Sequence, residues 1–305
     1  MSVLGGCISS RATRKRKVET DANAQKKVHG LASACSSVPS QMERTKANSL
    51  SSVEELSQLI EELVEKNSSA EVLETPVLIG RLPSLELWDD YGLDDRVPLS
   101  PKHLFLDDDL DLYLVELPSN KHEYMAEHIL LQLRDQCEYI ESFGSGRTNH
   151  MEADKRISPS ELTPNLHLPP GVPMSCLSTL VIEIGLSQNW TGQRGLDAKA
   201  KKWFRIRNSL GLQYILCVKV DIDRTSRGIT DVSYKLYDLQ LMTTFRTSAA
   251  THLYLAQNAL GARIQLDARR VLSIPANQPL PQTFIGDSFF INLETTRDQT
   301  ILRGF

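Results

Sequence analysis

Cysteine is scarce in this sequence, and its cysteines show no spacing that would give them a shared role. The chain has 305 residues and five cysteines, an odd number without a Cys-x-x-Cys motif: Cys7, Cys35, Cys137, Cys176 and Cys217. Scattered cysteines of this kind favour reduced thiols over a disulfide framework or a zinc cluster. We therefore predict an intracellular protein.

Long apolar runs are also absent, and neither sign of charge dominates. No segment approaches the roughly 20 apolar residues that a membrane-spanning helix needs. The first residues lack the apolar core of a signal peptide, so we expect no membrane association. The formal net charge of −4 excludes a uniformly basic nucleic-acid binder, and any nucleic-acid site must be local.

Each sign of charge is concentrated in its own segment. Residues 1–50 carry nine Lys and Arg residues against three acidic residues, a net charge of +6, and few large apolar side chains. We predict a disordered basic tail there. Its cluster Arg14–Lys17 would serve as a nuclear localisation signal, which slightly favours a nuclear over a cytoplasmic location. Residues 86–116 carry ten acidic residues against two basic ones, a net charge of −8. This segment predicts a solvated acidic face or a mimic of nucleic-acid charge.

Residues 51–84 predict a short amphipathic helix followed by a linker. The helix, over residues 52–65, begins with the capping-box pattern Ser52-Val-Glu-Glu55. Its apolar residues recur at helical spacing: Val53, Leu56, Leu59, Ile60 and Leu63. The helix is too short for a stable coiled coil. We expect it to dock onto the rest of the chain or onto a protein partner, and we expect residues 66–84 to be a linker.

The stretch Leu180–Leu186 is apolar except for one acidic residue. Side chains alternate along a strand, so Val181, Glu183 and Gly185 share one face. A carboxyl group among apolar residues must be paired, protonated or metal-bound, because burying it alone is costly. The alternative is an edge strand with Glu183 in solvent.

A basic helix predicted over residues 196–210 provides a cation near this strand. Helical periodicity places Lys199 in the centre of the apolar stripe, beside Trp203 and Ile206. The ammonium group either extends to the rim of the stripe or meets Glu183 in one cleft. We take the second arrangement as the hypothesis.

The pattern of elements predicts an α/β fold with a central mixed β-sheet flanked by helices. A strand pattern at residues 213–220 follows the basic helix, so strand, helix and strand form a parallel crossover unit. We assign residues 85–250 to this α/β domain. Residues 251–305 form a C-terminal extension that either belongs to the same domain or hangs from it.

This order of elements and three short motifs resemble the PD-(D/E)xK nuclease-like superfamily. The similarity is to its uncharacterised fungal members and to bacterial restriction-endonuclease-like domains. The motifs are Glu152–Pro159 with an Asp, Leu180–Gln188 with a Glu, and Asp197–Trp203 with a Lys. The resemblance covers about residues 115–240 and implies a restriction-endonuclease-like core.

In that superfamily an Asp, a Glu and the carbonyl group after the Glu hold a divalent cation. The resemblance assigns these positions to Asp154, Glu183 and Ile184, with Mg²⁺ or Mn²⁺ as the cofactor. Hard cations of this kind prefer oxygen ligands. The metal would lower the pKa of bound water and neutralise charge on the scissile phosphate.

The sequence departs from the family pattern at the catalytic lysine. Gly185 stands where the strand lysine is expected, and it leaves space on the face of Glu183. The resemblance implies that Lys199 fills this space and aligns the attacking water, with Gln188 as a weaker substitute. The family often has a further acidic residue on the preceding helix, and Glu127 or Glu123 would supply it.

The resemblance therefore implies a metal-dependent phosphodiesterase, a nuclease acting on DNA or RNA. Three basic residues on the rim of the second helix, Lys201, Lys202 and Arg205, would contact phosphates and make binding salt-dependent. If these residues form an ordinary solvated helix face, they would not contact phosphates and binding would not depend on them.

Two alternatives need no catalysis. One is a catalytically inactive module of the same fold that binds protein or nucleic acid. The other is an interaction protein in which the pair of Glu183 and Lys199 is purely structural. The sequence leaves the oligomeric state open.

Overall fold

A computed structural model of the chain describes residues 50–67, 73, 75–94, 96–142, 147–148, 151–223, 225–253 and 263–303. The basic tail predicted over residues 1–50, with its cluster Arg14–Lys17, lies outside the described residues except for Leu50. Residues 45–305 form one compact unit, and the following description concerns that unit.

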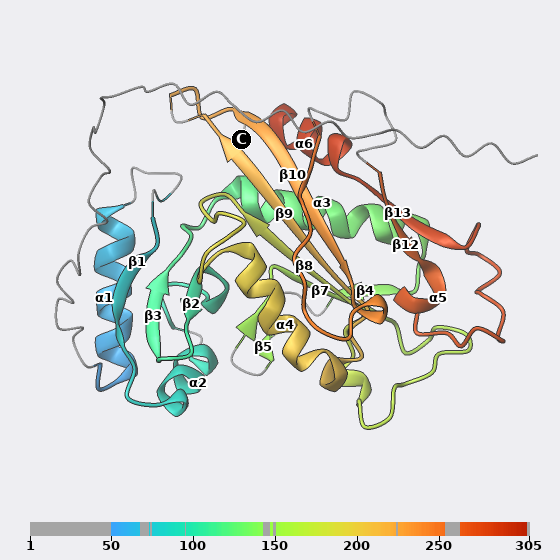
Figure 1. The fold of residues 1–305 in the computed structure, drawn as a ribbon, viewed down its shortest axis with the longest axis horizontal. Coiled ribbons are helices and arrows are strands. Elements are labelled where there is room, and N and C mark those ends of the chain that lie inside the picture. Colours follow the sequence, from blue (N-terminus) through green and yellow to red (C-terminus); the bar gives the residue numbers. More distant parts are fainter. Residues whose placement is uncertain are drawn as a thin grey trace, which may run out of the picture. The chain divides into compact units, whose positions relative to one another are not determined.

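A six-stranded sheet lies at the centre of the unit (Figure 1). Its strands lie in the order β11-β10-β9-β8-β7-β4, with β8 and β9 parallel and the other neighbours antiparallel. The bounds are β4 (Ile140–Ser142), β7 (Lys155–Pro159), β8 (Leu180–Gly185), β9 (Tyr214–Ile222), β10 (Ile229–Asp238) and β11 (Thr251–His252). The predicted α/β class with a central mixed sheet is confirmed.

Helices cover both faces of this sheet, because both faces of β8 are apolar. On one face lies α4 (Leu196–Leu210), and there Val181 belongs to the same hydrophobic cluster as Trp203. On the other face lies α3 (Asn120–Gln136), in whose cluster Ile182 takes part. Odd and even positions of β8 therefore point to different helices, as the alternation of side chains predicts.

The C-terminal residues complete the hydrophobic cluster around α3. They form β12 (Arg263–Asp267), α5 (Ala268–Val271), β13 (Ser288–Asn292) and α6 (Leu293–Leu302), with β12 and β13 paired antiparallel. Leu266 and Phe289 are fully buried in that cluster. The side-chain amide of Gln136 donates to the carbonyl oxygen of Phe290 at 2.7 Å and accepts from its N–H at 2.9 Å. This amide fixes β13 to α3 much as a neighbouring strand would.

Residues 50–117, here called the N-terminal lobe, form a smaller sheet with its own hydrophobic cluster. Its three antiparallel strands lie in the order β1-β3-β2. The elements are α1 (Val53–Lys66), β1 (Val77–Arg81), α2 (Leu85–Leu93), the 3-10 turn η1 (Pro101–His103), β2 (Leu104–Leu106) and β3 (Asp111–Leu114). The segment expected to be a linker thus contains a strand, β1. Its five residues include a glycine, and such a short run gives little periodic signal.

The helix predicted over residues 52–65 is α1, and it begins as the capping pattern predicts. The Ser52 hydroxyl accepts a hydrogen bond from the N–H of Glu55 at 3.2 Å. Leu56 and Ile60 are fully buried within the lobe, so the chain itself covers the apolar face of the helix. A protein partner for this helix stays a prediction.

The remaining elements are short. The strands β5 (Arg147–Thr148) and β6 (Met151–Glu152) pair with each other, and 3-10 turns occur at η2 (Met174–Cys176) and η3 (Leu239–Leu241). In the ranges that the structure describes, no helix combines the length and the apolar character needed to cross a membrane.

The end of α4 provides a test of the fold. Gly211 has a φ of 67°, and an added Cβ would lie 2.9 Å from carbon atoms of Leu177 and of Pro169. We expect Gly211→Ala to lower the free energy of unfolding by about 1–3 kcal/mol, measured by urea denaturation.

Gly171→Ala is the matched control. Gly171 has a φ of 76°, and a Cβ there would meet no described atom within 4 Å. The variant therefore isolates the cost of the left-handed backbone and should lose less stability. Equal losses for the two variants would contradict a role for the contacts of Gly211.

Candidate active site

Glu183 is the charged residue of β8 and lies in the middle of the sheet, with none of its surface exposed. The antiparallel register pairs Lys155 of β7 with Ile182 of β8. Continued by one residue, this register sets Asp154 opposite Glu183. Asp154 is also buried, with 2% of its surface exposed. The two carboxyl groups named by the motifs therefore lie close together in the interior of the protein, Glu183 in β8 and Asp154 directly before the neighbouring strand β7.

Side chains of α4 donate hydrogen bonds to both carboxyl oxygen atoms of Glu183. Lys199 Nζ lies 3.2 Å from Oε2, and Trp203 Nε1 donates to Oε1 at 2.6 Å. Lys199 and Trp203 are one helical turn apart and share a face of α4. The predicted pairing of Glu183 with Lys199 is confirmed, and the alternative of an edge strand with Glu183 in solvent is wrong.

The space above Gly185 is filled differently from the prediction. An added Cβ would lie 3.1 Å from a methyl carbon of Leu196 and 3.3 Å from Cβ of Gln188. Leu196 precedes Lys199 by nearly one helical turn, so it covers Gly185 while Lys199 reaches Glu183. Gln188 is 2% exposed, and its amide oxygen and nitrogen have no hydrogen-bond partner among the described residues. A buried amide in this state requires a partner such as a water molecule or a ligand.

Asp154 is held by the main chain and by a histidine. Its Oδ2 accepts a hydrogen bond from the N–H of Ile184 at 2.6 Å. Its Oδ1 forms a buried ion pair with Nε2 of His122 at 3.1 Å. The same Nε2 is 3.1 Å from the carbonyl oxygen of Ile184. His122 therefore stands at two of the oxygen atoms that the resemblance assigns to a cation.

A third buried carboxyl group, Glu116, was not predicted as part of the site. It follows β3, is 1% exposed, and accepts a hydrogen bond from the N–H of Leu186 at 2.6 Å through Oε1. Its signal in the sequence resembles that of Glu183, since it is a single acid closing an apolar run, residues 112–115.

The predicted accessory acids lie at the rim of this cluster. Glu123 is 2.5 Å from Nζ of Lys102, and Glu127 is 2.8 Å from Nζ of Lys155. Their side chains are 46% and 43% exposed. Glu116 is therefore the acid that joins the buried carboxyl groups, and it comes from the loop before α3 and not from the helix itself.

Burial acts on the pKa of every group in the cluster. It raises the pKa of Glu183 to about 7, with the charge of Asp154 adding to the effect and that of Lys199 opposing it. Burial also raises the pKa of Glu116. For Asp154, burial is outweighed by the charges of His122 and Lys199 and by hydrogen bonds, so its pKa lies below the usual value.

The two cations of the cluster keep their charge in spite of burial. Burial alone would lower the pKa of His122, but the charges of Asp154 and Glu116 raise it well above the usual value. The same competition raises the pKa of Lys199, with Glu183 as the strongest opposing charge. Three carboxyl groups thus share the interior with two cations, and the pKa values of Glu183 and Glu116 are raised first by burial and then by the charge of Asp154.

A small cavity borders the pair of Glu183 and Lys199. Its volume is about 40 Å³, and the N-terminal lobe lines it with Trp88, Leu104 and Phe105, among others. A polar cavity of this size holds a water molecule. The lobe also approaches the pair directly, because Lys199 donates to the carbonyl oxygen of Lys102 at 3.2 Å.

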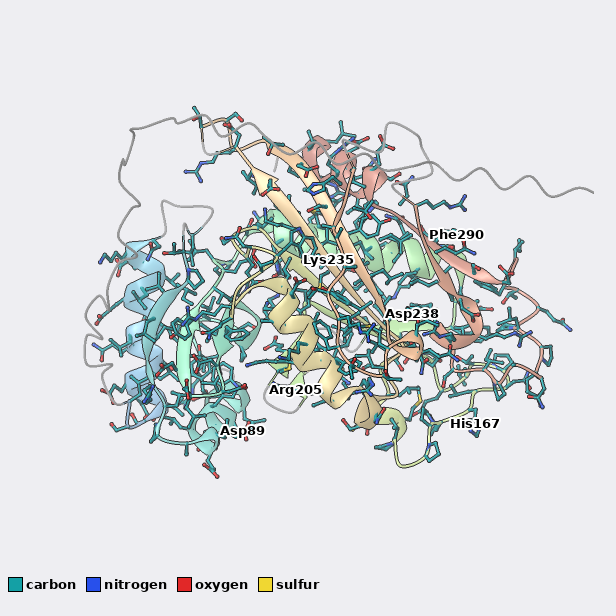
Figure 2. All side chains as sticks on the ribbon, viewed as in Figure 1. Asp89, His167, Arg205, Lys235, Asp238 and Phe290 are labelled. Atoms are coloured by element: carbon teal, nitrogen blue, oxygen red, sulfur yellow. The ribbon has the colours of Figure 1, made fainter. Side chains whose placement is uncertain are left out.

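A second buried ion pair fixes the start of α4. Lys235, labelled on β10 in Figure 2, lies 2.8 Å and 2.9 Å from the two carboxylate oxygens of Asp197. The hydroxyl of Tyr237 donates to the same carboxylate at 2.6 Å. Since Asp197 precedes Lys199 by two residues, this pair helps to set the position of the lysine.

The three predicted phosphate contacts differ in their surroundings. Lys201 is exposed and lines a groove. Lys202 donates to the carbonyl oxygen of Leu106, and Arg205 lies 3.4 Å from Asp108. Two of the three cations are therefore engaged by the N-terminal lobe.

Comparisons with protein-family models, with curated proteins and with solved structures found no match. Within the described ranges, no three His, Cys, Asp or Glu side chains form a ready-made metal-binding group. The protein's function is therefore inferred from the contacts, burial and charges of the cluster.

The ion pair of Glu183 and Lys199 predicts a strong coupling in stability. We expect Lys199→Met to lower the free energy of unfolding by about 3–5 kcal/mol, because a buried carboxylate loses its main cation. The double variant Glu183→Gln/Lys199→Met should lose less than the sum of the two single variants in a double-mutant cycle of urea denaturation. Additive losses would show that the two side chains do not stabilise each other.

The raised pKa of Glu183 predicts a dependence of stability on pH. The folded protein holds this proton up to about pH 7, whereas the unfolded chain releases it near 4.5. The resulting stabilisation is present at low pH and is lost as the pH rises between these values. The wild type should therefore lose stability relative to Glu183→Gln over this range. Glu127→Gln, at the exposed rim, should leave the pH dependence unchanged; a pH-independent difference for Glu183→Gln would contradict the assignment.

Proposed function

We propose that the protein is a metal-dependent phosphodiesterase, a nuclease with a restriction-endonuclease-like core that cleaves DNA or RNA. The observation that carries the proposal is the hydrogen bond from Ile184 N–H to Asp154, since it ties Asp154 to the residue that follows Glu183, the partner of Lys199. The order α3, β7, β8, α4, β9, with β8 and β9 parallel, agrees with the family resemblance and supports the same proposal.

The chemistry of the cluster fits a hard divalent cation such as Mg²⁺ or Mn²⁺. Carboxyl groups outnumber cations in the cluster, and Oδ1 of Asp154, now paired with Nε2 of His122 at 3.1 Å, is an anionic oxygen of the kind that such a cation prefers. Asp154, Glu183 and the carbonyl group of Ile184 would hold the metal. When bound, it would supply a lowered pKa for coordinated water and neutralisation of phosphate charge.

The protein's own residues would position the other participants. Lys199 is fixed between Glu183 and the carbonyl oxygen of Lys102, beside a cavity with room for a water molecule. Its ammonium group would orient that water through a remaining N–H. Trp203 holds Glu183 in place, and residues of the N-terminal lobe line the cavity beside it.

A catalytically inactive module of the same fold, binding protein or nucleic acid, is the second candidate. The position of His122 favours it, since Nε2 lies 3.1 Å from both Asp154 Oδ1 and the Ile184 carbonyl oxygen. A protonated imidazole there compensates the charge of Asp154 without any metal.

Calorimetric titration with Mg²⁺ and Mn²⁺ tests the first candidate. We expect the wild type to bind metal and to cleave labelled oligonucleotides. Asp154→Asn and Glu183→Gln, with folding verified by circular dichroism, should weaken metal binding by at least about 10-fold and abolish cleavage. Glu62→Gln, at an exposed position of α1 outside the site, is the matched control, and it should retain both properties.

Absence of metal binding and of cleavage in folded wild-type protein would contradict the enzyme. Oligonucleotide binding that persists in that case would support the inactive module. Metal binding that appears only in His122→Ala would assign the inactivity to the imidazole.

A further inference from the structure

The acidic segment of the N-terminal lobe runs along one cationic side of α4. Three side chains spaced three residues apart contact it: Lys199 donates to the Lys102 carbonyl oxygen, Lys202 to the Leu106 carbonyl oxygen, and Arg205 approaches Asp108. Residues at this spacing lie on neighbouring parts of one helix surface. The segment 102–108 therefore follows the same line as the row of cations.

Two of the three cations have poor partners in the lobe. Lys202 meets a neutral carbonyl oxygen, and Arg205 meets an exposed carboxylate at 3.4 Å. Lys199 is buried and paired with Glu183. Hydrogen bonds from Lys and Arg are stronger when the acceptor is ionised, as in a phosphate. Phosphates along this line would offer Lys202 and Arg205 better partners than the lobe does.

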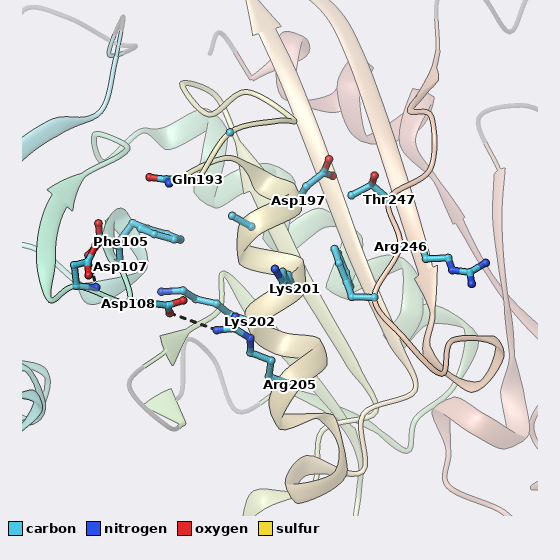
Figure 3. Close-up of a pocket in the computed structure, with 14 residues that line it drawn as sticks. Phe105, Asp107, Asp108, Gln193, Asp197, Lys201, Lys202, Arg205, Arg246 and Thr247 are labelled. Atoms are coloured by element: carbon cyan, nitrogen blue, oxygen red, sulfur yellow. Dashed lines mark hydrogen bonds and ion pairs between the residues drawn. The ribbon is translucent and has the colours of Figure 1, made fainter. Parts of the chain in front are cut away.

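An open groove of about 960 Å³ lies beside this row. The close-up in Figure 3 shows Asp107 and Asp108 on one side of α4 and Arg246 and Thr247 on the other. Lys201 on the exposed side of α4 lines the same groove. The groove thus combines cations with an acidic wall.

We propose that this groove binds the backbone of a single-stranded nucleic acid and that the turn Asp107–Asp109 is a built-in competitor for it. The turn forms an ion pair with Arg205, and the strand that precedes the turn accepts a hydrogen bond from Lys202. A bound strand replaces these contacts with phosphates. The inference rests on the proposed function in taking a nucleic acid as the ligand, and it gives the acidic segment a role.

The turn is built to present one carboxylate outward. Oδ1 of Asp107 accepts the N–H groups of Asp109 at 3.0 Å and Asp111 at 2.9 Å, which holds the turn in shape. The side chain of Asp108 is 77% exposed and that of Arg205 51%. Exposed ion pairs of this kind are weak, so a polyanion can displace the turn without unfolding the lobe.

Aromatic rings favour a single strand over a duplex. Phe105 and Phe245 both line the groove. Bases of a single strand are free to stack on aromatic side chains, whereas those of a duplex are already stacked. Phe105 is 5% exposed, and Lys202 lies 4.0 Å from the centre of its ring. The half-buried Phe245 is therefore the ring on which a base would stack.

Fluorescence anisotropy with labelled single-stranded DNA and RNA tests the proposal on the full chain, in EDTA so that neither metal nor cleavage matters. We expect Asp108→Asn/Asp109→Asn to bind on the order of 3- to 10-fold more tightly than the wild type. Lys201→Gln should bind more weakly and with a shallower dependence on salt.

Glu61→Gln/Glu65→Gln is the matched control, because it changes the net charge equally at exposed positions of α1 outside the groove. Equal tightening in this control, no binding by any variant, or a stronger response with duplex DNA would each overturn the proposal. Tighter binding by the Asp variant together with no cleavage in Mg²⁺ would support the competitor and contradict the phosphodiesterase, so the two failures are distinguishable.

Discussion

Glu116, His122, Asp154, Glu183 and Lys199 are buried together, and each depends on the others for its charge state. None of the five exposes more than 5% of its surface. An isolated ionised group at this depth would be neutralised or would destabilise the fold. Interactions among these charges, together with apolar packing, therefore fix the positions of the elements that carry them: the end of β3, the start of α3, β8 and the inner face of α4.

Helix α4 contacts both the buried charged cluster and the N-terminal lobe. Lys199 and Trp203 of α4 reach inward to Glu183, whereas Lys202 and Arg205 reach sideways to the N-terminal lobe. The pair of Asp197 and Lys235 fixes the start of the helix on β10. A displacement of the lobe would consequently change the contacts of Lys199, which binds both Glu183 and the lobe.

Local patterns were enough to predict the strand around Glu183 and the helix around Lys199. The single charge in an apolar run identified Glu183 as buried, and helical periodicity placed Lys199 on the inner face of its helix. Their contact could be predicted because β8 and α4 follow each other in the sequence. His122 and Glu116 were missed as members of the cluster for the opposite reason. Glu116 lies in a loop and His122 at the start of α3, both more than 60 residues before Glu183 in the sequence. Only tertiary packing brings them next to Asp154 and Glu183. Glu123, one of the two predicted accessory acids, follows His122 directly, and a rotation of about 100° along the helix takes it to the rim.

The dependence of the five groups on one another also limits how the sequence can change. Replacing any one of them leaves a buried partner without compensation, so substitutions are tolerated mainly when several occur together. Natural selection for folding alone would then retain Asp154, Glu183 and Lys199, whatever the chain does with a substrate. In a chain of this fold without any catalytic activity, the same residues would persist as the framework of its interior.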